Sequence, residues 1–317
     1  MINKIHEPIV KKYTKNYIAI DFKKYRLNLK YRIYILKLIN DYYFDYAINL
    51  IPHRYPKIAD ELIVICNSHK KICYVGDDIN INNSEYYYNK FYNEKIPYLE
   101  SLKNENKKYY HIFEHEKTIY YHLCKENKFK SNIKDFYLNA FMDLKKKLTK
   151  KYNFKYVCII TDASAPFRKY PRDKWQIILN NLPKDVKIIQ IGLNKFPLKH
   201  PNLIDLTGKT SLEEAMSIVM NASLVIGNET GLTHLGYLSG VPTVCILGGG
   251  HFGRFLPWDE FDDIVKCTYN KMDCFQCGWR CKYVNLKKGE VPPCIKNIKP
   301  EKVIDAINEL NEKYNIF

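Results

Sequence analysis

Four cysteines near the carboxyl end of the chain have the spacing of a metal site. Cys274, Cys277, Cys281 and Cys294 follow the pattern C-x2-C-x3-C-x12-C, with no other cysteine inside it. Thiolates at this spacing suit a tetrahedral four-sulfur site for Zn²⁺ or Fe, and four protein ligands leave no coordination position open for catalysis. We therefore expect a structural Zn or Fe ion in the loop 274–294, with a disulfide pair or free thiols as alternatives. We expect no organic cofactor.

A polar turn with a glycine at each end has the chemistry to bind an anion. The turn 227–231, Gly-Asn-Glu-Thr-Gly, follows the apolar run 224–226 and precedes a helical stretch that Gly240 and Pro242 end. Backbone N–H groups at the start of a helix are unpaired and carry partial positive charge, which suits a phosphate or a sugar hydroxyl. The alternative interpretation is an ordinary solvated loop between a strand and a helix.

These residues need a scaffold, and the pattern after residue 155 predicts one. Apolar runs and amphipathic stretches alternate there, which favours a parallel sheet with helices on both faces. The predicted strands cover 156–160, 186–191, 203–206, 224–226 and 243–247. The predicted helices cover 173–182, 212–221 after a cap at Thr210 and Ser211, 232–239 and 300–314.

The first 150 residues predict a less regular α/β domain. Helical spacing occurs at 31–40, 59–68 and 109–125, strand character at 46–51 and 71–75, and an insertion rich in Asn, Tyr and Lys at 77–108. A linker falls near 129–151. The predicted domains are therefore 1–150, 151–299 and a C-terminal helix at 300–317.

Composition limits the class of protein. The chain has 317 residues, of which 46% are hydrophobic, enough for two domains with cores. Residues 1–20 lack a secretory signal and no stretch approaches 18 consecutive apolar residues, so we expect a cytoplasmic protein. The net charge of +16 favours anionic partners such as sugar nucleotides, acidic membrane surfaces or nucleic acid. The charge comes mostly from scattered lysines, which favours a solvated surface over a nucleic-acid patch.

Several segments together resemble glycosyltransferase family 9, the heptosyltransferase-like proteins. The resemblance is carried by Thr-Gly-Lys-Thr-Ser-Leu-Glu at 207–213, the string 223–234 around the polar turn, and Gly-Val-Pro-Thr-Val at 240–244. The segment 163–171 with Trp175 resembles the family's phosphate loop, whereas the N-terminal half is similar only at 44–49 and 73–76. The resemblance implies the α/β GT-B fold, with two Rossmann-like domains facing a cleft and a shortened or divergent N-terminal domain.

The resemblance also implies a sugar-nucleotide donor bound mainly by the C-terminal domain. The small residues Ala163 and Ser164 would let the backbone approach a diphosphate, while Arg168 or Lys169 would supply positive charge, Arg168 being the match to the family lysine. Glu213 matches the position that accepts hydrogen bonds from the donor ribose.

Two further segments complete the implied donor site. The family's Asp-Thr-Gly-x-x-His motif corresponds here to Asn228, Glu229, Thr230, Gly231 and His234, with Glu229 where Asp is usual. His251 and Arg254 follow the glycines 248–250, which would allow a close backbone approach, and are expected to contact the donor diphosphate. A flexible loop is the alternative for this last segment.

The activity implied is inverting transfer of a heptose-like sugar to a cell-envelope glycan or a protein. The family's base is an aspartate near a Gly-Asp turn after the first strand, and no such turn opens this chain. Carboxylates are available at Asp21, Asp45, Asp60, Asp77 and Glu114, but the catalytic base stays unassigned. The alternatives are a non-catalytic sugar-nucleotide-binding or scaffold relative and, less favoured, a nucleic-acid-binding metal protein. Peripheral contact with the inner membrane and an oligomer are compatible with the sequence.

Overall fold

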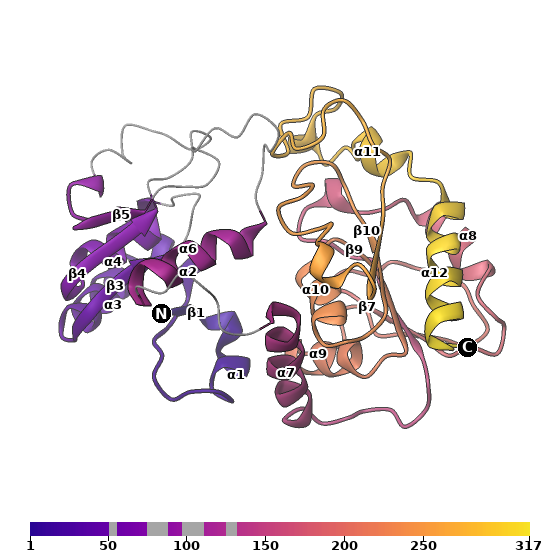
Figure 1. The fold of residues 1–317 in the computed structure, drawn as a ribbon, viewed down its shortest axis with the longest axis horizontal. Coiled ribbons are helices and arrows are strands. Elements are labelled where there is room, and N and C mark those ends of the chain that lie inside the picture. Colours follow the sequence, from indigo (N-terminus) through magenta and orange to yellow (C-terminus); the bar gives the residue numbers. More distant parts are fainter. Residues whose placement is uncertain (51–55, 75–87, 97–110, 125–131) are drawn as a thin grey trace. The chain divides into compact units, whose positions relative to one another are not determined.

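The computed structural model describes residues 1–50, 56–74, 88–96, 111–124 and 132–317, which divide into two compact units. The first unit is Met1–Phe129 and the second is Lys130–Phe317 (Figure 1). Asp77, most of the predicted insertion 77–108 and both ends of the predicted helix 109–125 lie outside the described residues. Among the described residues, no helix has both the length and the apolar character needed to cross a bilayer.

The second unit is built on a six-stranded sheet with the order β11-β10-β9-β6-β7-β8, in which every pair is parallel. Its strands are β6 (Val157–Ile160), β7 (Ile188–Ile191), β8 (Leu203–Asp205), β9 (Leu224–Asn228), β10 (Thr243–Ile246) and β11 (Val265–Thr268). Its helices are α7 (Ile133–Lys146), α8 (Arg172–Asn180), α9 (Leu212–Met220), α10 (Gly231–Leu238), α11 (Pro293–Lys296) and α12 (Pro300–Tyr314). The predicted parallel sheet is confirmed.

Helices cover both faces of this sheet. Figure 1 shows α8 and α12 on one face and α9 and α10 on the other. Every residue of β6, β7, β9 and β10 is buried, which explains why these strands are continuous apolar runs rather than alternating ones. The core on the α8 side is centred on the fully buried Trp175. A capping box between Ser211 and Glu214 fixes the start of α9.

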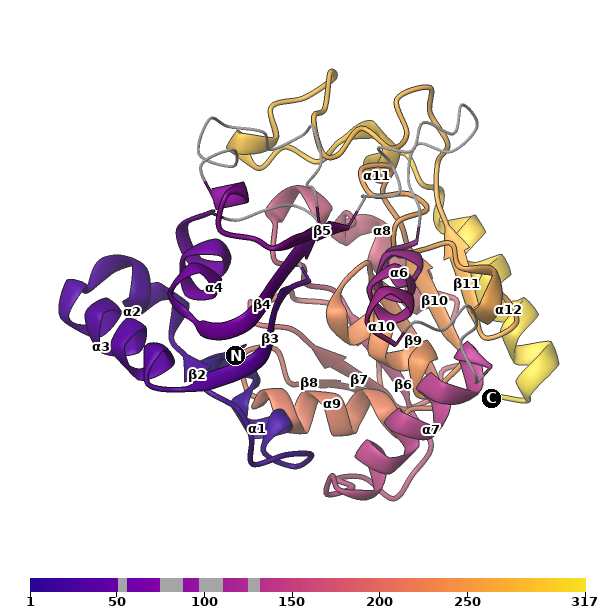
Figure 2. The ribbon, with the colours of Figure 1, turned by 60° about the vertical axis from the view of Figure 1, so that its left-hand side comes forward.

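The first unit contains a smaller parallel sheet with the order β3-β4-β5 (Figure 2). Its strands are β1 (Ile2–Asn3), β2 (Ala19–Ile20), β3 (Tyr43–Asn49), β4 (Asn67–Tyr74) and β5 (Glu94–Ile96), of which β1 and β2 form a separate parallel pair. Its helices are α1 (Glu7–Val10), α2 (Phe22–Leu27), α3 (Leu29–Asn40), α4 (Glu61–Ile65) and α6 (Ile112–Cys124). Side chains from α2, α3, α4 and the sheet form one core.

Three boundaries differ from the sequence prediction. The helix predicted at 59–68 ends at Ile65, after a π-helical turn at Pro56–Asp60 and α4, because the chain pairs with β3 from Asn67 onward and becomes a strand. The first unit ends at Phe129 rather than near residue 150, because α7 packs on the second unit, where Tyr137 meets Trp258 edge to face at 5.8 Å between ring centroids. Helix α12 belongs to the second unit too, since Val303, Ile307 and Leu310 are buried in its core.

Candidate functional site

Most of the predicted donor-site residues lie around the carboxyl ends of three neighbouring strands of the second sheet, β6, β9 and β10, and Glu213 follows β8 at the same edge. The register pairs Ile160 at the end of β6 with Gly227 on β9, and Asn228 at the end of β9 with Ile246 on β10. The loops that follow these strands therefore leave the sheet at one edge. Parallel α/β sheets bind ligands at this edge.

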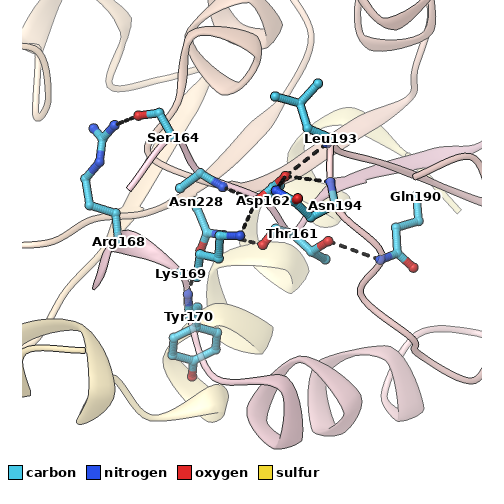
Figure 3. A network of polar contacts seen from close by, with 11 residues as sticks. Thr161, Asp162, Ser164, Arg168, Lys169, Tyr170, Gln190, Leu193, Asn194 and Asn228 are labelled. Atoms are coloured by element: carbon cyan, nitrogen blue, oxygen red, sulfur yellow. Dashed lines mark hydrogen bonds and ion pairs between the residues drawn. The ribbon is translucent and has the colours of Figure 1, made fainter. Parts of the chain in front are cut away.

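Asn228 holds two of these segments together. It is fully buried, its side-chain oxygen accepts a hydrogen bond from the Tyr170 N–H at 3.1 Å, and its amide nitrogen donates to the Thr161 carbonyl at 2.8 Å (Figure 3). Both ends of the amide are thus used inside the protein. This arrangement positions the loop after β6, whereas direct contact of the Asn228 side chain with a ligand stays a prediction.

Asp162 fixes the loop after β6 against the loop after β7. Its carboxylate accepts hydrogen bonds from the N–H groups of Ala163, Leu193 and Asn194, each at 2.9 Å, and from the Asn194 side chain (Figure 3). Lys169 completes the set with an ion pair of 2.6 Å. Burial alone would raise the pKa of Asp162, but Lys169 and the N–H donors outweigh it and lower the pKa. Sequence reasoning missed this residue, although it directly follows Thr161 at the strand end.

Arg168 and Lys169 therefore have different surroundings. Arg168 is the last residue of the short helical turn Pro166–Arg168, and its guanidinium donates a hydrogen bond to the hydroxyl of the exposed Ser164, which precedes the turn (Figure 3). Lys169 is instead committed to the nearly buried carboxylate of Asp162. Of the two cations, Arg168 is the better placed to reach a bound anion.

The start of α10 has the properties predicted for an anion site. Thr230 is extended and caps the helix without a side-chain hydrogen bond to its N–H groups. The first intrahelical bond with Thr230 runs from the N–H of His234 to the Thr230 carbonyl. Gly231 is exposed, and a Cβ added to it would meet no heavy atom within 4 Å. Open space thus lies beside Gly231, in the first turn of the helix, whose N–H groups have no partner within the helix.

Glu229 is buried directly behind this helix start. The residue is 5% exposed, and its Oε2 has no hydrogen-bond partner in the part of the chain that the structure describes. Burial raises the pKa of the Glu229 carboxyl to about 7, and the charge of Arg168 lowers it only in part. Burial thus favours the neutral carboxyl, which can donate a hydrogen bond as well as accept one.

His234 and Glu213 lie on the two helices that start at this edge. The His234 Nδ1 is 3.0 Å from the Tyr237 hydroxyl, and its ring contacts Phe255 with centroids 6.0 Å apart. Glu213 is the second residue of α9 and is partly exposed, whereas its neighbour Glu214 is used in the capping box. Glu213 is thus not required for the cap.

The glycines 248–250 make room for aromatic side chains. A Cβ at Gly249 would lie 2.4 Å from the ring of Phe275, and one at Gly250 would lie 2.2 Å from the ring of Trp279. The close approach that these glycines permit is therefore made by the cysteine loop itself. Two backbone hydrogen bonds stabilise this contact. The Gln276 N–H donates to the Gly249 carbonyl at 2.7 Å, and the Gly278 N–H donates to the Gly250 carbonyl at 2.9 Å.

Trp279 connects the cysteine loop to the candidate site. Its ring lies 5.2 Å from that of Phe167 and 5.8 Å from that of His251, between centroids. Its backbone adopts the left-handed region, with φ of 60°, which is rare for a bulky residue and is held only where surrounding contacts require it. Arg254, in the loop that contains His251, is 5% exposed. Trp279 was not singled out in the sequence analysis. The signal that could have indicated it is its position between Cys277 and Cys281, two of the predicted metal ligands.

The four cysteines of the predicted metal site line one small cavity of about 10 Å³, together with Gly249, Trp279 and the prolines 292–293. A cavity of this size holds about one water-sized sphere. The described residues contain no disulfide among these thiols and no group of three or more His, Cys, Asp or Glu side chains already arranged as a metal site. The sulfurs would have to draw together around an ion, and metal binding stays a prediction.

The carboxylates considered as a base have varied surroundings. Asp21 caps α2 through the Lys24 N–H, and Glu114 pairs with Lys117 at 2.7 Å. Asp60 is wholly buried and accepts hydrogen bonds from Asn49 and from the hydroxyl of Tyr92. Asp45 is exposed on β3, and Asp77 lies outside the described residues.

Sequence comparison finds similarity to one family. The model of "Glycosyltransferase family 9 (heptosyltransferase)" matches residues 98–284, more than half of the chain. A lipooligosaccharide heptosyltransferase 2 of Campylobacter jejuni is 27% identical over 107 residues, which are 34% of this chain and 32% of that protein. A lipopolysaccharide heptosyltransferase 1 of Campylobacter coli is 25% identical over 191 residues, 56% of this chain and 52% of that protein. The chain thus matches between a third and a half of the length of these relatives.

Solved structures share the fold. A family 9 glycosyltransferase of Veillonella parvula superposes with a TM-score of 0.64 at 15% identity, covering 98% of this chain and 88% of that one. The ADP-heptose LPS heptosyltransferase II of E. coli gives 0.60 at 10% identity, with 99% and 89% covered. The E. coli heptosyltransferase WaaC with ADP gives 0.57 at 15% identity, with 79% and 77% covered. The expected α/β GT-B fold class is confirmed.

Proposed function

Because the chain belongs to glycosyltransferase family 9, we propose that it transfers a heptose-like sugar from a nucleoside diphosphate to a glycan or protein acceptor of the cell envelope, with inversion. The similar proteins are named as heptosyltransferases of lipopolysaccharide or lipooligosaccharide, and one of the similar structures contains ADP. An ADP-linked heptose is therefore the donor we propose. We also propose that the protein acts in the cytoplasm, at the membrane that carries such an acceptor.

One observation carries this proposal. The open space at Gly231, the unpaired N–H groups at the start of α10 and the guanidinium of Arg168 occur at the same edge of one parallel sheet. Backbone N–H groups, a helix N-terminus and an arginine are a common combination for binding a diphosphate. An ordinary solvated loop requires neither the open space, nor the helix N-terminus, nor the arginine.

In the proposed reaction, these groups would stabilise the leaving group. An acceptor oxygen forms a bond to the anomeric carbon while the bond from that carbon to the diphosphate oxygen breaks. Negative charge develops on the diphosphate, where Arg168 and the helix N-terminus stabilise it. The acceptor hydroxyl gives its proton to a base that we leave unassigned.

A nucleotide panel tests the donor site. Isothermal titration calorimetry and thermal shift with ADP, UDP, GDP and ADP-heptose should give the strongest binding with the adenine compounds. Release of ADP in the presence of lipopolysaccharide-type acceptors would support transfer. Donor binding without turnover on any acceptor would favour the non-catalytic relative. Failure of every nucleotide to bind would contradict the donor site itself.

We propose in addition that Cys274, Cys277, Cys281 and Cys294 hold one structural Zn or Fe ion. The support is the small cavity that all four line and the affinity of thiolates for these metals. The ion would cross-link the loop without taking part in the reaction. Its effect on the site would pass through Trp279, which packs on Phe167 and His251.

Elemental analysis of the purified protein tests the metal. About one equivalent of Zn or Fe is expected per chain, and Cys277→Ser should lose it. Cys66→Ala removes a buried cysteine of the first unit and should keep the metal. A metal-free wild-type protein with four titratable thiols in this loop would contradict the proposal.

A further inference from the structure

Helices α2 and α3 carry a strong local excess of positive charge. Residues 22–40 contain six basic side chains and no acidic one. Arg32 is used internally, since its guanidinium pairs with Glu61 and lies over the ring of Tyr25. The other five are exposed: Lys23, Lys24, Arg26, Lys30 and Lys37.

Large apolar side chains are exposed on the same two helices. Leu27 is 77% exposed, Leu29 69%, Ile33 44% and Tyr34 58%. Asn28, which joins the helices, caps α3 through the Tyr31 N–H and leaves the two flanking leucines at the turn. Exposed apolar side chains that lie next to one another, unlike single ones, mark surfaces that bind a protein or a membrane.

The exposed residues of α3 form one face of the helix. At about 100° per residue, positions 29, 30, 33, 34 and 37 fall within about 140° of arc, with apolar and lysine side chains interleaved. Ile35 and Ile39 on the opposite side are buried in the core with α2 and α4. Figure 2 shows α2 and α3 as neighbouring helices of the first unit. Helix α3 thus buries one side and presents a basic, apolar face, and the neighbouring α2 adds the exposed Lys23, Lys24, Arg26 and Leu27.

We propose that this face of α2 and α3, with Leu27, Leu29, Ile33 and Tyr34 among Lys30 and Lys37, binds the surface of an anionic phospholipid bilayer. Lysines beside exposed aliphatic and aromatic side chains are the composition of helices that lie in a membrane interface. Nucleic acid would match the charge, but about half to two-thirds of protein–DNA hydrogen bonds go to phosphate and sugar, which leave most of this exposed leucine and isoleucine surface uncovered. The inference extends the proposed function and rests on it only for the source of the membrane, which would carry the acceptor.

Vesicle co-sedimentation of the full chain tests the surface. We expect binding to vesicles of phosphatidylcholine with phosphatidylglycerol, at least tenfold weaker binding to phosphatidylcholine alone, and a marked loss of binding in high salt. An apolar variant carries Leu27→Ser, Leu29→Ser and Ile33→Ser. A charge variant carries Lys23→Glu, Lys30→Glu and Lys37→Glu. Each should weaken binding to the anionic vesicles at least tenfold.

The control variant makes the same change of charge on the second unit. It carries Lys184→Glu, Lys187→Glu and Lys299→Glu, all at exposed positions, and should bind the anionic vesicles within about twofold of the wild type. Equal loss in the control would overturn the proposal, because net charge alone would then explain binding. So would unchanged binding of the apolar variant, or a higher affinity for an RNA oligonucleotide that only the charge variant loses.

Circular dichroism and ADP titration of each variant separate the two proposals. Variants that unfold cooperatively like the wild type and bind ADP normally, yet no longer bind vesicles, support the surface. ADP binding that fails in the wild type while vesicle binding behaves as described would contradict the donor site and leave the membrane surface supported.

Discussion

At the scale of single residues, Arg168 and Lys169 are neighbours in the chain with different partners. Lys169 pairs at 2.6 Å with Asp162, whose side chain is only 9% exposed, whereas Arg168 contacts the exposed Ser164. We expect Arg168→Ala to weaken ADP binding by about tenfold or more, because a charge-assisted contact to phosphate is lost, and to change stability little. Isothermal titration calorimetry and thermal unfolding measure the two effects, and Arg172→Ala on α8 is the control for loss of charge.

Lys169→Met should have the opposite profile. Removing the cation leaves a nearly buried carboxylate with only neutral donors, which should lower the free energy of unfolding by about 2 kcal/mol. Because the folded pKa of Asp162 is lowered, the stabilisation from its ionised form is present above the unfolded pKa and is lost as pH falls through the folded pKa. The difference between wild type and variant should therefore shrink in acid. Urea unfolding at pH 7 and pH 3 measures it, and an equal difference at both would refute the pairing.

Glu229 should give a pH dependence of the other sign. Its folded pKa is raised to about 7 by burial, so its neutral form costs nothing below the unfolded pKa near 4.5, and stability is lost as pH rises through 7. The groups that face it are Arg168, Tyr237 on α10, Cys245 on β10 and Cys267 on β11.

Glu229→Gln should therefore stabilise the protein at pH 8.5 by on the order of 3 kcal/mol and change it little at pH 5. Unfolding in urea at the two values checks this. Glu214→Gln is the control, since the pKa of Glu214 is lowered, chiefly by the Ser211 N–H, and its ionised form stabilises the helix cap. A gain that does not vary with pH would contradict the raised pKa.

At the scale of elements, two glycines separate ligand binding from packing. Gly231 faces open space at the start of α10, so Gly231→Ala should leave stability unchanged or slightly raised, since alanine favours the helix. The new methyl group would occupy the space we assign to the donor phosphate and should weaken ADP binding at least tenfold. Calorimetry measures the ADP affinity and thermal unfolding measures the stability of the same sample. An unaltered ADP affinity would mean that the donor phosphate binds elsewhere.

Gly250→Ala is the matched change inside the fold. Its methyl group would lie 2.2 Å from the ring of Trp279, which must move. Overpacking of this kind lowers the free energy of unfolding by about 1–3 kcal/mol. Because Trp279 also contacts Phe167 and His251, a secondary loss of ADP affinity should follow the loss of stability. Wild-type stability in this variant would mean that the cysteine loop does not pack on the glycines.

At the scale of the whole molecule, the second unit has everything that the proposed donor site requires. Two apolar cores in its described part draw their buried residues from positions 157–316, and α7 packs against one of them through Tyr137 and Leu138. A fragment of residues 130–317 should therefore unfold cooperatively and bind ADP within about threefold of the full chain, since no donor contact is assigned to the first unit. Far-UV circular dichroism and calorimetry measure both, and a folded fragment that fails to bind ADP would assign part of the donor site to residues 1–129.

Much of the second unit follows from the sequence alone. Local patterns predict the strands at 224–226 and 243–247, the helix after Gly231 and the cap at Ser211, because each of them depends on residues that are close together in the sequence. The first unit is less predictable, because pairing with β3 extends β4 back to Asn67 where the local pattern favours a helix.

The tertiary structure alone decides what several site residues contact. Asn228 meets Tyr170 across 58 positions of sequence, and Asp162 meets Asn194 across 32. Trp279 fills the space at Gly250, which its position among cysteines does not reveal. Such contacts depend on which strands are neighbours and on their register, and these are set by the packing of the whole unit. The sequence by itself determined the class of fold and pointed to the candidate site, and only the fold decided that Lys169 pairs with the nearly buried Asp162 while Arg168 contacts the exposed Ser164, where we propose that it meets a ligand.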